Sequence, residues 1–71
     1  MTATAEDVFN WNAWYLQKRD GFLSAAKTWR SIAHTAQMEG DEDVVIMAHR
    51  NALENEALAN DAELKAKEFG L

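Results

Sequence analysis

The two histidines are the residues of this chain best suited to metal binding or proton transfer. His34 and His49 are the only histidines, and the chain has no cysteine. Neither histidine has a carboxylate or a second histidine four residues away, and the Glu-x-x-His spacing of di-iron helical bundles is absent. Glu56 follows His49 by two helical turns, too far to share one ion unless other helices supply ligands. The sequence therefore predicts no metal site and no cofactor.

Nucleophilic or acid–base catalysis finds equally little support. No serine, lysine or acidic residue stands in a recognisable nucleophile or acid–base arrangement. A chain of 71 residues built from helices also offers little concave surface for a substrate. We therefore expect a protein that is not an enzyme.

A short cationic row could contact phosphate. Lys27, Arg30 and His34 follow one another at steps of three and four, with Arg19 nearby, so they share a helix face. Small Rop-type plasmid regulators, which are dimers of helical hairpins, present such a face to paired RNA loops, although the likeness is one of architecture without a shared residue motif. The net charge of -5 opposes nonspecific binding to nucleic acid. RNA binding is kept as an alternative function.

The acidic residues gather in the second half of the chain. Residues 1–40 carry four acids and four bases, whereas residues 41–71 carry eight acids and three bases. Glu54, Asp61 and Glu68 lie one heptad apart, on one helix face. An acidic helix can imitate a nucleic-acid backbone and inhibit a DNA- or RNA-binding protein, but such a face more often keeps a protein in solution. Mimicry is the second alternative.

Helices must position all of these groups. The chain has no proline and only three glycines, and its apolar residues recur at helical spacing, which predicts one all-α domain over residues 1–71. Thr4 to Asp7 resemble a capping box, so we expect a first helix over about 5–39, a turn at 40–41 and a second helix over about 42–69. The heptad pattern continues through Gly21, which favours one long helix with room for a kink there. A break at Gly21 would give a three-helix bundle instead.

The two expected helices carry complementary stripes at alternating steps of three and four. The first stripe is rich in aromatic residues: Val8, Trp11, Tyr15, Lys18, Phe22, Ala25, Trp29, Ile32 and Ala36. The second is rich in alanine: Val45, Ala48, Ala52, Asn55, Ala59, Ala62, Ala66 and Phe69. Large side chains facing small ones predict an antiparallel hairpin whose helices pack closely.

A hairpin of this size buries little apolar surface by itself. Domains below about 70–80 residues usually rely on disulfides, a metal or oligomerisation, and the absence of cysteine leaves oligomerisation. We expect a homodimer that forms a four-helix bundle. Its self-association residues are predicted to be Trp11, Tyr15, Phe22, Trp29 and Ile32.

Side chains outside the first stripe are the expected partner-binding site. Six of the seven aromatic residues lie within residues 9–29. Trp14 flanks the stripe on one side, and Phe9, Leu16 and Leu23 flank it on the other. Aromatic anchors dominate many protein interfaces, so we expect binding to a protein partner as an adaptor, an inhibitor or a regulatory subunit, of the kind found among phage or mobile-element accessory proteins.

The location of the protein is predicted from its segments. Met1 to Asp7 have no positively charged region followed by an apolar one, and no uncharged run approaches the length of a membrane span. We expect a cytoplasmic protein.

Overall fold

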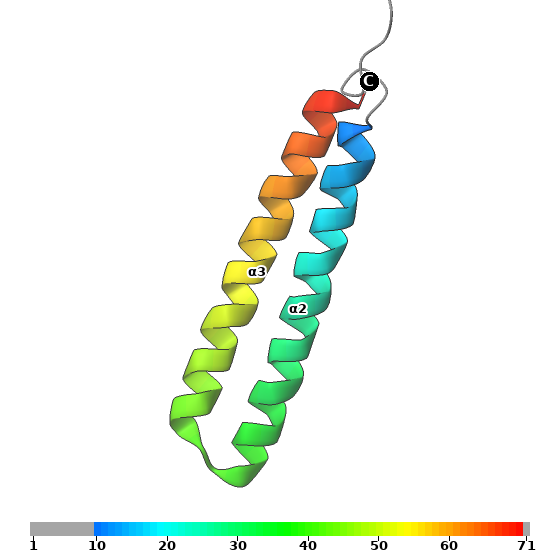
Figure 1. The fold of residues 1–71 in the computed structure, drawn as a ribbon. Coiled ribbons are helices and arrows are strands. Elements are labelled where there is room, and N and C mark those ends of the chain that lie inside the picture. The colour runs from blue at the N-terminus through cyan, green and yellow to red at the C-terminus, as the bar shows by residue number, and fades with distance from the viewer. Residues whose placement is uncertain (1–9, 71) are drawn as a thin grey trace, which may run out of the picture.

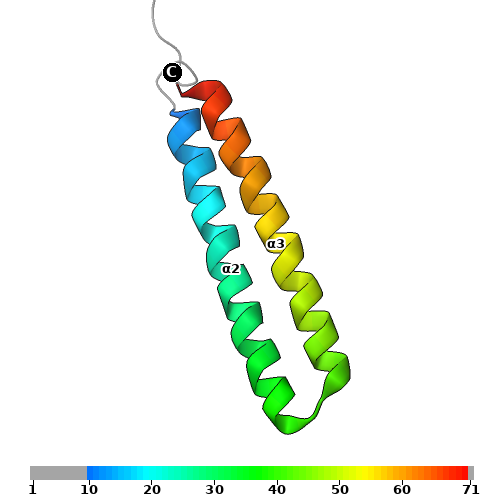
Figure 2. The same cartoon turned by 180° about the vertical axis from the view of Figure 1, so that it is seen from behind.

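The described part of the chain folds into two long helices that lie side by side along their whole length (Figures 1 and 2). The computed structural model describes residues 10–70, in which helix α2 spans Trp11–Glu39 and helix α3 spans Glu42–Phe69. The predicted all-α hairpin is confirmed. Because α2 is helical through Gly21, the alternative of three helices is wrong for the described part of the chain. Neither described helix is apolar over enough of its length to cross a bilayer.

Helix α2 begins at Trp11, whereas the sequence predicted a start near Ala5. Asn10 has an extended backbone conformation, and its side chain accepts a hydrogen bond from the Ala13 amide at 3.1 Å. An asparagine in this position satisfies one of the free amides of the first turn and so fixes the start of a helix. The capping box expected at Thr4 to Asp7 lies outside the described residues.

Gly40 makes the turn between the helices. Its φ of 77° is left-handed, the Gly40 amide donates to the Gln37 carbonyl, and the Asp41 amide donates to the Ala36 carbonyl at 2.9 Å. This pair of bonds is a Schellman motif, which glycine permits because it has no Cβ. The Asp41 carboxylate then accepts from the Val44 amide and begins α3 at once. The predicted turn at 40–41 is therefore confirmed.

The core between the helices consists of alanine alone. Among residues 10–70, every side chain in the buried class belongs to an alanine: Ala26, Ala33, Ala36, Ala48, Ala52, Ala59, Ala62 and Ala66. We call this row the alanine seam. Small side chains let two helix backbones approach closely, but each buries little area, so the seam gives less hydrophobic stabilisation than a leucine core of equal length.

The seam matches the predicted stripe of α3 and only half of that of α2. On α3, all five buried alanines belong to the predicted stripe. On α2, Ala26 and Ala33 are buried, whereas the sequence placed Ala25 and Ile32 at the corresponding positions. The other half of the predicted α2 stripe does lie against α3, since Ala36 is buried and Phe22 is half-buried. Helix α2 is therefore rotated by about half a residue step from the predicted orientation. Phe22, Trp29 and Ala36 stay beside α3, whereas Lys18 and Ile32 turn away from it.

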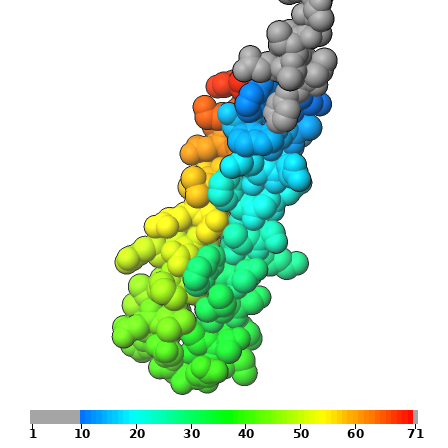
Figure 3. Space-filling view, in the orientation of Figure 1, coloured from blue at the N-terminus to red at the C-terminus, as the bar shows by residue number. Residues whose placement is uncertain are grey.

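Within residues 10–70, ten large apolar side chains keep more than a third of their surface exposed. They are Trp11, Leu23, Ile32, Met38, Ile46, Met47, Leu53, Leu58, Leu64 and Phe69. In the space-filling view the hairpin is a narrow rod on which side chains project from both helices (Figure 3). Contiguous groups of such side chains are candidate interaction surfaces, and they are described below.

Candidate interaction surfaces

An aromatic cluster closes the open end of the hairpin, where α2 begins and α3 ends. Tyr15 stacks on Phe69 with 5.8 Å between ring centroids and 12° between planes. Trp11 lies 6.2 Å from both of these rings, and Trp14 meets Trp11 and Tyr15 edge-on at 5.6 and 4.9 Å. The Asn12 amide adds a polar link by donating to the Ala66 carbonyl in the last turn of α3 at 2.7 Å.

Two ion pairs join the helices on one side of the hairpin. Arg19 donates to Glu63 at 3.2 Å, and Arg30 pairs with Glu56. Arg19 also donates a hydrogen bond to its neighbour Asp20 at 2.9 Å. This bond and the carboxylate of Glu63 raise the pKa of Arg19 above its ordinary value, and desolvation opposes them in part. We call this side, defined by Arg19, Arg30, Glu56 and Glu63, the ion-pair side.

The predicted partner-binding residues fall on different sides. Trp14 is half-buried, and the Lys18 ammonium lies 4.7 Å from the centre of its ring. Leu16 and Leu23 follow the helical spacing of Arg30, so they lie on the ion-pair side; Leu16 is half-buried and Leu23 is 46% exposed. Phe9 lies outside the described residues. Trp14, Leu16 and Leu23 therefore do not form one continuous site.

The predicted self-association residues keep to the opposite side of α2. Tyr15, Phe22 and Trp29 are half-buried, while Trp11 and Ile32 are 39% and 37% exposed. Their partial exposure agrees with a surface that the hairpin itself covers only in part. Dimerisation stays a prediction.

A shallow hollow of about 250 Å³ opens between the helices on this same side. Both helices line it, with four residues each: Trp14, Tyr15, Lys18, Phe22, Leu58, Asp61, Ala62 and Lys65. Three further side chains lie on the same side as the hollow, beyond its edge. Trp29 is one heptad after Phe22 and Ile32 is two heptads after Lys18. On α3, Met47 is three turns before Leu58. We call this side the aromatic face and define it by Trp14, Phe22, Trp29, Ile32, Met47 and Leu58.

A third apolar surface runs along the outer side of α3. Ile46, Leu53 and Leu64 are 58%, 63% and 60% exposed, and Ala57 completes the row. Spacings of seven, four and seven place these four residues on one line, away from the alanine seam. These four residues do not belong to the alanine-rich stripe predicted from the sequence. The sequence contained the pattern that would have identified this surface. A line of apolar residues opposite the packed stripe is what a helix needs in order to contact a second helix. We call them the outer row.

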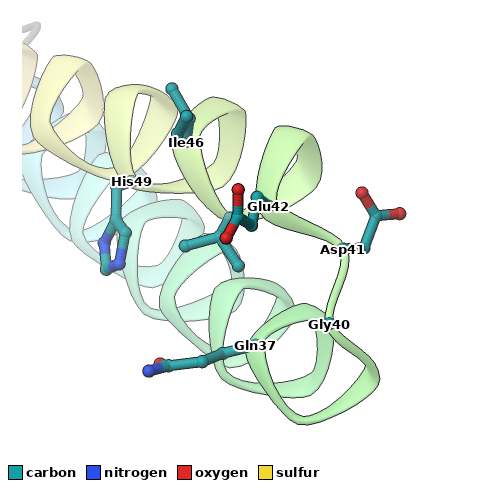
Figure 4. Close-up of a pocket in the computed structure, with 7 residues that line it drawn as sticks. Gln37, Gly40, Asp41, Glu42, Ile46 and His49 are labelled. Atoms are coloured by element: carbon teal, nitrogen blue, oxygen red, sulfur yellow. The ribbon is translucent and has the colours of Figure 1, made fainter.

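A second concavity lies at the turn between the helices. Its volume is about 420 Å³, and it is lined by Gln37, Gly40, Asp41, Glu42, Val45, Ile46 and His49. Figure 4 shows the Asp41 carboxylate pointing away from the His49 ring, and Asp41 is already engaged as the N-cap of α3. His49 is exposed, as is His34. Within residues 10–70 no three His, Cys, Asp or Glu side chains gather closely enough to hold a metal.

The residues of the two nucleic-acid alternatives are only partly available. Arg19 and Arg30 form ion pairs with Glu63 and Glu56. Arg30, Lys27 and His34 are exposed members of the predicted cationic row, and Arg19 is half-buried. The predicted acidic row is fully exposed: Glu54, Asp61 and Glu68. Asp61 also lines the hollow together with Lys18 and Lys65. Neither charge pattern dominates the molecule.

Comparison with known protein families, with curated proteins and with solved structures found no match to this chain.

Proposed function

We propose that this chain is a small, non-enzymatic interaction protein of the cytoplasm that self-associates into a four-helix bundle and binds a protein partner. One observation carries the proposal: alanine makes up the buried core of residues 10–70, while ten large apolar side chains stay exposed. Fully burying one such side chain is worth about 1.5–3 kcal/mol, so covering them would add substantially to a weak core. Adaptor, inhibitor and regulatory subunit are the roles that fit.

The outer row is the surface best suited to the protein partner. Ile46, Leu53 and Leu64 project from one line of a straight helix, which suits the apolar seam of a partner helix. Exposed acids flank this line, including Asp43, Glu54 and Glu68 in addition to Asp61. We infer that the partner presents an amphipathic helix with basic residues beside its apolar seam, because such flanks would match these carboxylates.

The test compares Leu53→Lys with Thr35→Lys, which lies on the other helix and away from the outer row. Both positions are exposed, so neither change should alter the helical circular dichroism or the midpoint of unfolding by more than a small amount. We look for a protein that the unmodified chain and Thr35→Lys retain from cells of the source organism and that Leu53→Lys does not. This protein is then purified and its affinity is measured directly.

A Leu23→Lys variant tests the site that the sequence predicted. Loss of the same partner with Leu23→Lys and not with Leu53→Lys would move the site to the ion-pair side. Equal binding of the purified partner to all four proteins would contradict an apolar docking site on either surface.

A further inference from the structure

The aromatic face is an apolar surface on both helices that the hairpin leaves partly uncovered. Trp14, Phe22 and Trp29 on α2 are half-buried, and Ile32, Met47 and Leu58 keep 37%, 44% and 46% of their surface exposed. The opposite side is closed by the Arg19–Glu63 and Arg30–Glu56 pairs. The ion-pair side thus carries charged links between the helices, whereas the aromatic face has apolar side chains from both helices.

The size of this face fits a second copy of the chain. Helix α2 has 29 residues, which at 1.5 Å per residue gives about 43 Å, and two adjacent helices are about 20 Å wide. One face thus offers about 850 Å², close to the ~800 Å² per partner of a standard stable interface. A two-fold dimer uses the same surface on both copies, so a face that is apolar over both helices can be self-complementary.

The hollow decides the orientation of the second copy. All four residues of α2 that line it precede Ala25, the middle residue of that helix. If the two turns lay at the same end, each hollow would face the other hollow, leaving an unfilled void and bringing Lys18 and Lys65 of one copy against those of the other. Voids and opposed like charges both weaken an interface.

Turns at opposite ends remove both problems. Ile32 lies as far after Ala25 as Lys18 lies before it, so a two-fold axis at Ala25 places Ile32 of one copy over the hollow of the other. The bulky end of each face, with Trp14 and Phe22, then meets the slimmer end of its partner. Large side chains set against small ones keep the two helical layers evenly spaced.

Gly21 gives a second observation in favour of this orientation. It is exposed within α2, has a helical φ, and nothing lies within 4 Å of the place where its Cβ would be. Glycine inside a helix costs about 1 kcal/mol relative to alanine, so the hairpin alone gains nothing from it. Gly21 is as far before Ala25 as Trp29 is after it. A second copy with its turn at the opposite end brings a Trp29 ring to the level of Gly21.

We propose that a second copy of this chain covers the aromatic face with its turn at the opposite end, so that Ile32 of each copy fills the hollow of the other. This proposal rests on the self-association proposed above and adds its surface, its orientation and its contacts. Ala25 then lies next to the two-fold axis, facing its counterpart.

Cysteine cross-linking tests the orientation, since the chain has no cysteine of its own. With the turns opposed, the two Ala25 Cα atoms approach within the ~4.4–6.8 Å that a disulfide spans, so Ala25→Cys should form a linked dimer under mild oxidation. With the turns at the same end, α2 faces α3 and the two Ala25 residues lie roughly 12 Å apart, across the diagonal of the bundle. Ser31→Cys, exposed on the outer side of α2, is the control that should not link.

Sedimentation equilibrium of two further variants tests the contacts. Ile32→Ala should weaken the dimer by at least about ten-fold, since it removes the side chain that fills the hollow, while Met38→Ala, at 78% exposed, should not. Gly21→Leu should dissociate the dimer, yet it should keep the helical signal and stabilise the hairpin itself slightly, because leucine is the better helix former and the hairpin has space at this position.

The outcomes separate the two proposals. An unmodified chain that stays monomeric at the highest soluble concentration overturns self-association and this dimer together. A stable dimer whose dissociation constant is unchanged by Gly21→Leu and Ile32→Ala overturns only the surface and orientation proposed here. A stable dimer that forms no disulfide through Ala25→Cys does the same. A dimer that links through Ala25→Cys and is weakened by both other changes supports the proposal.

Discussion

The Tyr15 ring stacks on the Phe69 ring, 5.8 Å away and inclined by 12°, and so joins the second turn of α2 to the last residue of α3. These two residues are 54 positions apart in the chain. Their contact sets the alignment of the helices at the end opposite the turn, where fraying would otherwise begin. Gly40 fixes one end of the hairpin and this stack fixes the other.

Removal of the Phe69 ring should therefore loosen the open end. Phe69 is 53% exposed, so Phe69→Ala should lower the free energy of unfolding by only about 1 kcal/mol, the usual worth of an aromatic pair at a partly exposed site. Urea unfolding followed by circular dichroism measures this loss, and amide exchange should show it concentrated in the last turns of α3. A double-mutant cycle with Tyr15→Leu checks the cause. Additive losses would mean that the two rings do not stabilise each other.

Gly40 should be the most sensitive position of the turn. Its φ of 77° suits glycine, so Gly40→Ala should destabilise the hairpin by about 1 kcal/mol although nothing lies within 4 Å of the added methyl group. Gly40→Asn is the matched control, because asparagine tolerates the left-handed conformation better and should lose less. Thermal unfolding compares the two variants. An equal loss for both would point to a cause other than the backbone.

The sequence predicted the two helices and their turn because those features depend on local chemistry. Gly40 and Asp41 are adjacent, and each satisfies backbone groups of its own helix end. The alanine stripe of α3 was predicted correctly because five of its eight positions are alanines that recur at helical spacing. In each case the signal lies within a few turns of chain.

The rotation of α2 could not be predicted in the same way. Helix α2 carries apolar residues at both Ala25 and Ala26, so its heptad pattern fits two neighbouring faces. The choice depends on the partner helix: α3 presents alanines, and a close approach between backbones places Ala26 and Ala33 inside while Ile32 turns outward. The ion pairs Arg19–Glu63 and Arg30–Glu56 depend on that rotation. They could not be predicted from the spacing of residues within a single helix.

The ion pairs should contribute little to stability and should depend on salt. The side chains of Arg30 and Glu56 are 48% and 40% exposed, and such pairs are typically worth about 0.2–1 kcal/mol. A double-mutant cycle of Arg30→Met and Glu56→Gln should give a coupling in that range in dilute buffer, and the coupling should nearly vanish in 1 M salt, where the Debye length is about 3 Å. A coupling unchanged by salt would show that packing rather than charge joins these residues.

The alanine seam should tolerate no larger side chain. Ala59 is 2% exposed, so Ala59→Leu would force the two backbones apart and should cost about 1–3 kcal/mol. Ala57 is two positions earlier on the same helix and exposed, so Ala57→Leu makes the identical chemical change with open space around it and should leave the free energy of unfolding nearly unchanged. Urea unfolding of both variants, at a concentration low enough to keep the chain monomeric, measures the difference. If Ala59→Leu were as stable as Ala57→Leu, the helices would have to be farther apart than an alanine core allows, and the exposed residues of α2 and α3 would then face each other rather than a second molecule.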